Sequence, residues 1–419
     1  MDSLRIEGGA RLTGSFRASG AKNAALPCLA ATLLTSQPVR LTNVPALRDI
    51  RTMTALLAEM GARLVWDEAN GEITLDCSGV FRLEAPYELV RTMRASVLCL
   101  GPLVARYGHA RVSLPGGCAI GERPIDQHLA GIEALGARID LSHGYVDARA
   151  RRLVGARIPM GLVTVTGTMN VVMAASLARG ESEIDNAACE PEVVNLCDFL
   201  RAMGAEIEGD GTPTIHIQGR EEFGGGDFAV MADRIEAGTY LIGCAMTGGT
   251  VSFAKADLAH LALPLALLRR AGVEIAGDGE TVQITGPERL TAVDATTAPY
   301  PAFPTDLQAQ WMAAMATADG VSVVREEVFE NRFMHVAELM RMGADIRVDG
   351  ATAVVRGVDS LSGAPVMATD LRASASLVLA GLIARGETCL ARIYHLDRGY
   401  EHLEEKLAAL GARVVRERG

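Results

Sequence analysis

Aromatic residues and lysines are scarce in this sequence. Phe, Trp and Tyr make up 4% of the 419 residues, although 49% are hydrophobic and the mean hydropathy is +0.19. We therefore expect a large core built from closely packed Ala, Val, Leu and Met side chains. Only three of the 40 basic residues are lysines, namely Lys22, Lys255 and Lys406.

Basic charge is also in deficit, since the formal net charge is −11 and the isoelectric point is about 5.3. Proteins that bind nucleic acid or anionic membranes present extended basic surfaces. We therefore expect no nucleic-acid partner and no membrane partner. A small anion held by a local basic pocket is still compatible with this composition.

The sequence lacks a secretory signal, because no basic stretch followed by an apolar stretch opens it. The longest uncharged run, residues 158–178, contains Pro159, Gly161 and Gly167. A membrane span needs about 20 predominantly apolar residues. We therefore expect this run to form a strand, a turn and a buried helix.

Paired cysteines are absent as well. No two cysteines form a CxxC motif, and no Cys/His cluster has zinc-binding spacing. This usage fits a reducing compartment, and we expect a cytoplasmic protein with free thiols. The eight positions are Cys28, Cys77, Cys99, Cys118, Cys189, Cys197, Cys244 and Cys389.

What the chain does contain is one pattern used six times. A stretch with helical apolar spacing ends at a glycine, and an alternating strand pattern follows, with a period of about 70 residues. Glycine just past a helix supplies a left-handed cap at little steric cost. The pattern predicts a small α/β unit repeated six times. The glycines are Gly61, Gly136, Gly204, Gly272, Gly343 and Gly411.

A second helix precedes each of these helices and is apolar or small nearly all round, as in 171–179 and 377–385. Such a helix is buried on all sides. Six units divide most simply into two lobes, with the join at the glycine-rich stretch 221–228. We expect a first lobe of residues 22–229 and a second lobe of residues 1–21 and 230–419. Residues 1–21 are expected to form a strand pair that completes the last unit.

Two segments near the amino terminus could carry chemistry. Lys22 lies in the glycine turn that opens a helix, where free N–H groups and a lysine favour an anion. The alternative is a surface lysine beside a helix cap. Cys118 lies among glycines, near Arg111 and Arg123 and before Pro124, and these neighbours favour a reactive thiol. The alternative is a buried structural cysteine.

The remaining candidates also lie where helices begin. Asp306 follows three prolines, and an ordinary helix cap is its alternative role. Basic side chains at similar turns could meet in one cleft and form an anion site, since arginine binds carboxylate and phosphate in a bidentate manner. His128 and His335 are isolated, and we expect structural roles for them. The cleft candidates are Lys22, Arg94, Arg123, Arg332, Arg372 and Arg398, with Asp306 and Asp370 among them.

Several of these segments together resemble the UDP-N-acetylglucosamine 1-carboxyvinyltransferases, the MurA family of enolpyruvyl transferases. The resemblance covers nearly the whole chain. It implies an α/β fold of two similar lobes, each with three βαββαβ units around buried helices. The segments are SGAKNAALP, TMRAS, LPGGCAIGERPIDQH, PAFPTDLQAQ, ENRFMH, MATDLRASASLVLAG and DRGYEHLEEKL.

The resemblance implies transfer of the enolpyruvyl group of phosphoenolpyruvate to the 3′-hydroxyl of UDP-N-acetylglucosamine, with release of phosphate, at the start of peptidoglycan synthesis. It implies no metal and no organic cofactor, and we expect a monomer. Cys118 corresponds to a loop cysteine that donates a proton and can bind phosphoenolpyruvate covalently. Its loop would be a lid. Asp306 corresponds to the carboxylate at the sugar 3′-hydroxyl, which can act as a general base.

The other site residues follow from the same resemblance. Lys22, Arg123 and Arg398 would hold the phosphate. Arg332 and Arg372 would lie near the carboxylate, and Asp370 would assist proton transfer. The remaining substrate contacts would be Asn23, Arg94, Arg123, Pro124, Ile125, Asp126, Gln127 and Val328.

The sequence departs from the family at Met169, where many relatives have a glutamate, so that segment receives no catalytic role. A cysteine at position 118 also resembles fosfomycin-sensitive members. One alternative is a 5-enolpyruvylshikimate-3-phosphate synthase, which has the same architecture but lacks such a cysteine loop. Others are a non-catalytic nucleotide-binding α/β repeat protein and a cysteine-based redox protein. The redox alternative is disfavoured because no resolving cysteine lies near Cys118.

Overall fold

The computed structural model describes residues 2–91, 93–114, 125–277 and 279–419. These residues form two compact units. We call the described part of residues 20–231 the N-terminal unit, and residues 2–19 with 232–419 the C-terminal unit. Within the described ranges each unit contains three four-stranded sheets.

One sheet of the N-terminal unit shows the repeat in full. Along the chain its elements alternate as strand, helix, strand, helix and a final strand pair, and the spatial strand order is β10-β11-β13-β12. The first two strands are parallel and the other pairs are antiparallel. The elements are β10 (Arg157–Pro159), α6 (Val165–Ala175), β11 (Glu181–Asp185), α7 (Pro191–Ala202), β12 (Glu206–Glu208) and β13 (Thr214–Gln218).

The other two sheets of the N-terminal unit follow the same plan, with orders β14-β3-β5-β4 and β6-β7-β9-β8. The first repeat has α1 (Lys22–Ala31), η1 (Thr32–Leu34), β3 (Val39–Thr42), α2 (Arg48–Met60), β4 (Arg63–Asp67), β5 (Glu72–Asp76) and β14 (Gly226–Ala229). The second has β6 (Glu84–Ala85), α3 (Tyr87–Val90), η2 (Arg94–Cys99), α4 (Leu100–Tyr107), β7 (His109–Ser113), α5 (Asp126–Ala134), β8 (Arg138–Ser142) and β9 (Tyr145–Arg149).

The C-terminal unit has sheets of order β16-β17-β15-β2, β18-β19-β21-β20 and β22-β23-β1-β24. The first has β2 (Thr13–Phe16), α8 (Arg234–Met246), β15 (Thr250–Ala254), α9 (Lys255–Leu258), α10 (Ala262–Arg270), β16 (Glu274–Ala276) and β17 (Thr281–Thr285). The second has β18 (Ala295–Thr296), η3 (Thr305–Leu307), α11 (Gln308–Met315), β19 (Val321–Arg325), α12 (Val336–Arg341), β20 (Asp345–Asp349) and β21 (Thr352–Arg356). The third has β1 (Ser3–Glu7), β22 (Pro365–Met367), α13 (Leu371–Ile383), β23 (Glu387–Ala391), η4 (Ile393–Arg398), α14 (Leu403–Ala409) and β24 (Arg413–Glu417).

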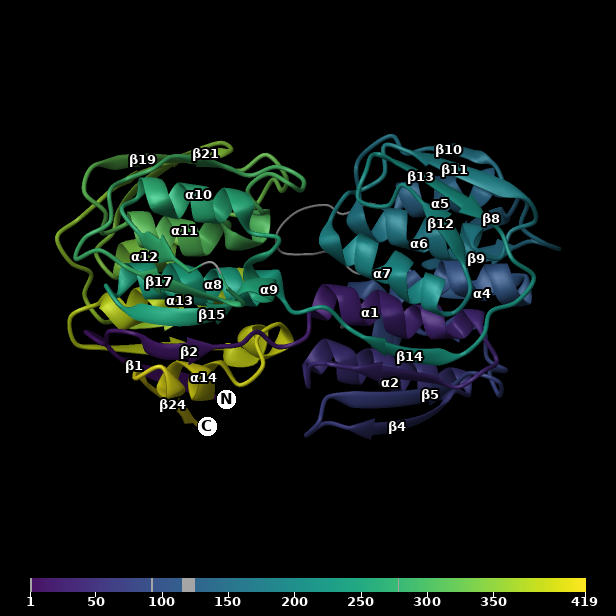
Figure 1. The fold of residues 1–419 in the computed structure, drawn as a ribbon, viewed down its shortest axis with the longest axis horizontal. Helices are drawn as coiled ribbons and strands as arrows, with labels where there is room; N and C mark the ends of the chain where they lie inside the picture. The colour runs from purple at the N-terminus through teal and green to yellow at the C-terminus, as the bar shows by residue number, and fades with distance from the viewer. Residues whose placement is uncertain (1, 92, 115–124, 278) are drawn as a thin grey trace. The chain divides into compact units, whose positions relative to one another are not determined.

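The expected two-helix repeat is confirmed by its glycines and by its buried helices. All six repeat glycines have positive φ, between 92° and 109°, so each supplies the left-handed residue after its helix. Helices α8 and α13 are buried along nearly their whole length, as predicted from their apolar composition. In Figure 1 the sheets containing β14 and β10 lie on opposite sides of α1, α6 and α7. Within the repeat, the strands and helices follow the order βαβαββ rather than βαββαβ.

Two expectations about strands are corrected by the pairing. Strand β1 completes the last sheet between β23 and β24, but β2 joins another sheet and pairs in parallel with β15. Residues 1–21 therefore serve two sheets rather than one. The glycine-rich stretch 221–228 is not only a join, because β14 begins within it and pairs in parallel with β3.

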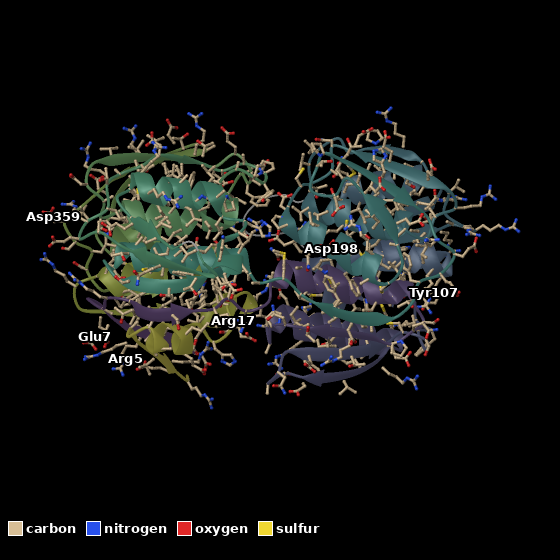
Figure 2. The ribbon with its side chains drawn as sticks, in the orientation of Figure 1. Arg5, Glu7, Arg17, Tyr107, Asp198 and Asp359 are labelled. Carbon is tan, nitrogen blue, oxygen red and sulfur yellow. The ribbon has the colours of Figure 1, made fainter. Side chains whose placement is uncertain are left out.

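The outer faces of the sheets carry the charged residues. Arg5, Glu7 and Asp359 lie at the outside of the C-terminal unit (Figure 2). Arg5 pairs with Glu417 at 3.1 Å across β1 and β24, and both side chains are about half exposed. Exposed pairs of this kind contribute little to stability. The fold therefore depends on its aliphatic core.

No helix in the described ranges is long and apolar enough to cross a membrane. Residues 158–178 form most of β10 and the whole of α6, as the sequence predicted. The seven described cysteines are all free, and five of them are buried.

A buried polar cluster joins three helices of the N-terminal unit. Asn170 is fully buried, and its Oδ1 accepts the amide of Gly101 at 2.8 Å. Its Nδ2 donates to the carbonyl of Val97 at 2.9 Å and lies 3.0 Å from Nδ1 of His128. Because Nδ2 is a donor, Nδ1 of His128 accepts, and Nε2 carries the proton that faces Thr166 Oγ1 at 3.3 Å. The histidine is therefore neutral in this cluster.

Replacing Gly101 with alanine should destabilise the N-terminal unit. A Cβ at this position would lie 2.5 Å from Oδ1 of Asn170 and would also clash with the Asn170 backbone carbonyl. Overpacking of this kind costs about 1–3 kcal/mol, which chemical denaturation would measure as a lower free energy of unfolding. Gly279→Ala is the control, because no heavy atom lies within 4 Å of a Cβ there. Equal stability of the two variants would contradict the packing argument.

Acid should destabilise the protein through His128. Burial, the largest cause, lowers the pKa of His128 to about 4 from its ordinary value of 6.5, and the nearby Arg94 charge lowers it further. Because the unfolded chain binds this proton first, the stabilisation is complete above about pH 6.5 and is lost as pH falls towards 4, a change of about 3 kcal/mol. The free energy of unfolding of His128→Gln should fall less over this range than that of the wild type.

The control for this titration is His143→Asn, in an exposed turn where the backbone φ of 53° suits asparagine. This variant should keep the wild-type acid dependence. If His128→Gln showed the same acid dependence as the wild type, His128 would not be the titrating group.

Candidate functional site

The carboxylate of Asp306 lies between two buried arginines in the C-terminal unit. Arg332 Nη2 donates to Oδ1 at 2.8 Å, while Arg372 donates to Oδ2 from Nη2 at 3.0 Å and from Nε at 3.2 Å. Arg332 and Arg372 are 4% and 3% exposed. Asp306 is more accessible, with 26% of its side chain exposed. An anion that approached Asp306 would therefore meet two guanidinium groups fixed in place.

Three separate repeat elements bring these side chains together. Asp306 lies in η3, the short turn that leads into α11, and Arg332 lies in the loop before α12. Arg372 is the second residue of α13. The contact between α11 and α13 is extensive, so the starts of the two helices are held as one block. The alternative role of Asp306 as an ordinary helix cap is not observed, since η3 and α11 have no side-chain cap.

Arg372 is charged and has donor capacity to spare. Burial by itself would lower the pKa of its guanidinium, but the charge of Asp306 outweighs this effect, and the pKa is raised. The Arg372 guanidinium also lies over the ring of Tyr400 at 5.4 Å. Its Nη1 is buried and has no hydrogen-bond partner within the described part of the chain. Buried donors normally have partners, so this N–H is available to a ligand oxygen.

Asp370 caps α13. Its Oδ1 accepts the amides of Arg372 at 2.8 Å and Ala373 at 3.0 Å, and its backbone carbonyl accepts the hydroxyl of Ser374. Such a cap stabilises a helix by about 1 kcal/mol. The structure therefore gives Asp370 a structural task that fixes the backbone beneath Arg372.

A polar cluster supports the site and was not anticipated from the sequence. Gln310 Nε2 donates to the Asp306 carbonyl at 3.1 Å and contacts Thr239 Oγ1 and Tyr400 Oη at 3.0 Å and 3.1 Å. Thr239 and Tyr400 are 2.9 Å apart. The signal was present as polar residues within apolar helices, but each of them is unremarkable alone.

The candidates in the N-terminal unit form a second group. Lys22 is the first residue of α1 and is buried, with its Nζ 3.2 Å from Oδ2 of the buried Asp49. The surface-lysine alternative is therefore wrong. Asn23, the next residue, is exposed. The ion pair holds the lysine ammonium at the start of the helix, where anions are favoured.

Arg94 and residues 125–127 lie at two other helix starts. Arg94 is half-buried at the first position of η2. Ile125 precedes α5, and Asp126 is exposed at its first position. The Oε1 atom of Gln127 accepts the amide of Gly161 at 2.6 Å, while its Nε2 donates to Asp126 at 2.9 Å. Gln127 thereby fixes the loop between β10 and α6.

Five other committed positions complete the survey. Val328 is 37% exposed, and its amide donates to Glu326 Oε1 at 2.9 Å. Arg398 is half-buried at the end of η4. Cys118, Arg123 and Pro124 lie outside the described residues. The expected meeting of basic side chains from both units in one cleft stays a prediction.

No group of three or more His, Cys, Asp or Glu side chains with metal-binding geometry occurs among the residues that the structure describes. The chemistry available at the Asp306 group is therefore that of a carboxylate and two guanidinium groups. Guanidinium groups bind carboxylate and phosphate, and a carboxylate beside them can accept a proton.

Comparison with known proteins places the chain in a family. Residues 6–407 match the family model described as EPSP synthase (3-phosphoshikimate 1-carboxyvinyltransferase). The enolpyruvyl transferase NikO from Streptomyces tendae has a similar structure, with a TM-score of 0.89 and 29% sequence identity over 99% of both chains. Two structures of EPSP synthase from Acinetobacter baumannii, each 18% identical over the full length of both chains, give TM-scores of 0.77 and 0.75. The last two similarities concern the fold alone.

The match covers nearly all of the chain, and the repeated four-stranded sheets agree with it. The expected enolpyruvyl transferase fold is confirmed. The chain belongs to the EPSP synthase family and is an enolpyruvyl transferase.

Proposed function

We propose that this enzyme transfers the enolpyruvyl group of phosphoenolpyruvate to the 3′-hydroxyl of UDP-N-acetylglucosamine and releases phosphate. The reaction would begin peptidoglycan synthesis and so serve cell-wall formation, cell shape and division in the cytoplasm. The observation that carries the proposal is the Asp306 carboxylate held by buried Arg332 and Arg372. The long motifs that resemble the MurA family support the choice of acceptor.

The ion pairs suggest how substrate binding activates Asp306. A carboxylate bound by two arginines is stabilised in its charged form and is a weak base. The carboxylate of phosphoenolpyruvate is the same chemical group and competes for the same guanidinium donors. As it takes over donors of Arg332 and Arg372, Asp306 becomes free to accept the proton of the acceptor hydroxyl. Arg372 Nη1 supplies one donor to the substrate from the start.

The other roles are carried over from the resemblance. Lys22, Arg123 and Arg398 hold the phosphate, and Cys118 protonates the enolpyruvyl carbon. Asp370 assists proton transfer through its position beneath Arg372. Helix starts favour such anion contacts because their N–H groups are unsatisfied. The nucleotide sugar contacts Asn23, Arg94, Arg123, Pro124, Ile125, Asp126, Gln127 and Val328.

A second candidate is a 5-enolpyruvylshikimate-3-phosphate synthase activity. The description of the matching family model favours it, as do the two EPSP synthase structures of the same fold. The donor and the chemistry are the same in both reactions. The two candidates differ only in the acceptor hydroxyl, so the acceptor decides between them.

The purified protein should release phosphate from phosphoenolpyruvate when UDP-N-acetylglucosamine is the acceptor. Shikimate 3-phosphate and UMP serve as competing acceptors in parallel assays. Asp306→Asn keeps the shape of the carboxylate but cannot take a proton, and its kcat should fall by about 10²–10⁴-fold. Release with shikimate 3-phosphate alone would favour the second candidate. Release with none of the acceptors would contradict both.

Cys118→Ser should lower kcat strongly while the free energy of unfolding stays within about 0.5 kcal/mol of the wild type. A serine hydroxyl is a much weaker acid than a thiol, so the enolpyruvyl carbon would lose its proton donor. Fosfomycin should add covalently to Cys118 alone, as peptide mass mapping would show. Cys189→Ser is the control, because that thiol is only partly buried and has no proposed role. Wild-type turnover in Cys118→Ser would remove the cysteine from the mechanism.

A further inference from the structure

Glu326 is a buried carboxylate that connects the loops on either side of the Asp306 group. It directly follows β19 and is 3% exposed. Oε1 accepts the hydroxyl of Thr297 at 2.9 Å and the amides of Val328 and Phe329 at 2.9 Å and 3.0 Å. Oε2 accepts the hydroxyl of Thr305 at 2.9 Å. Each carboxylate oxygen therefore has at least one well-defined donor.

Each of these donors is adjacent to a proposed site residue. Thr305 immediately precedes Asp306 in η3. Phe329 lies in the loop that leads to Arg332, and the Arg332 guanidinium lies 5.3 Å from the Phe329 ring centre. Glu326 thus holds the Asp306 segment with one oxygen and the Arg332 segment with the other.

The repeats show that this arrangement exceeds what the fold requires. In two other repeats the residue after the equivalent strand is an asparagine, Asn43 after β3 and Asn186 after β11. The Nδ2 atom of Asn43 donates to the Val230 carbonyl, and that of Asn186 donates to the Met160 carbonyl, at 2.8 Å and 2.9 Å. Each bond joins the end of this strand to the end of its parallel neighbour.

The register makes the three positions equivalent. Thr42 pairs with Ala229, Asp185 with Pro159 and Arg325 with Thr296, so the residue that follows each pair occupies the same place. Glu326 makes the same tie through Thr297. In addition it reaches Thr305 and the two loop amides, which the asparagine ties have no counterpart for in the residue pairs described above. A longer, charged side chain replaces an amide where the Asp306 group lies.

We propose that Glu326 is a positioning residue of the transferase site, which sets the separation of Asp306 from Arg332 by binding both of their segments at once. This inference rests on the proposed roles of Asp306 and Arg332. Charge-assisted hydrogen bonds are short and directional, so a single buried carboxylate can fix two loops together. A displacement of about 1 Å at a reacting group can cost about 10²-fold in rate.

The test compares Thr305→Val, Glu326→Ala and Glu326→Gln in steady-state kinetics. Thr305→Val removes only the bond next to Asp306, so kcat should fall about tenfold while KM for phosphoenolpyruvate changes less than twofold. Glu326→Ala releases both segments and should lower kcat and raise KM. Glu326→Gln keeps one oxygen for Thr297 and the loop amides and should recover part of the loss. Glu327→Gln is the matched control, since its side chain is 52% exposed, and it should behave as the wild type.

A crystal structure of Glu326→Ala keeps the inference separable from the proposed function. The 2.8 Å contact between Arg332 Nη2 and Asp306 Oδ1 should lengthen or break. If the contact is unchanged, or if the variants lose stability while kcat and KM stay at wild-type values, Glu326 is a structural tie like Asn186. If the wild type transfers no enolpyruvyl group but the contact breaks in Glu326→Ala, the proposed function fails while the positioning role stands.

Discussion

The constraint on which this protein depends is that each unit buries helices on every side. Helices α8 and α13 have apolar or small side chains around nearly their whole circumference, and only close packing against other helices and sheets removes that surface from water. Such helices have no free face for function. Polar side chains can therefore reach a ligand only where the helices begin. Lys22, Arg94 and Arg372 all occupy helix starts.

The Asp306 group shows how the C-terminal unit uses this arrangement. Its two arginines are almost fully buried, and removing charge from water is costly unless a partner compensates. Asp306 is that partner, and a substrate carboxylate can replace it because the two groups are chemically alike. The same ion pairs thus stabilise the unoccupied site and supply the interaction that a substrate would use. The supporting bonds from Gln310, Asp370 and Tyr400 hold the donors in place before any ligand arrives.

Comparison of the repeats separates what the fold needs from what the site needs. Three repeats join the ends of two parallel strands through one polar side chain, and in two of them that side chain is an asparagine with a single backbone partner. At Glu326 the same position carries a carboxylate with four donors. A repeated architecture therefore offers an internal reference, because a departure at one equivalent position indicates a local requirement.

The sequence alone determined the six-fold repeat, its glycine-ended helices and its buried helices, because apolar periodicity and the backbone freedom of glycine act over a few residues. It also indicated Asp306, Arg332 and Arg372 as candidates. Only the tertiary structure decided that β2 pairs with β15, that Asp306 binds both arginines rather than capping a helix, and that Asp370 is a cap. It also revealed Glu326 as their common support. These facts depend on contacts between residues far apart in the chain, which no local pattern encodes.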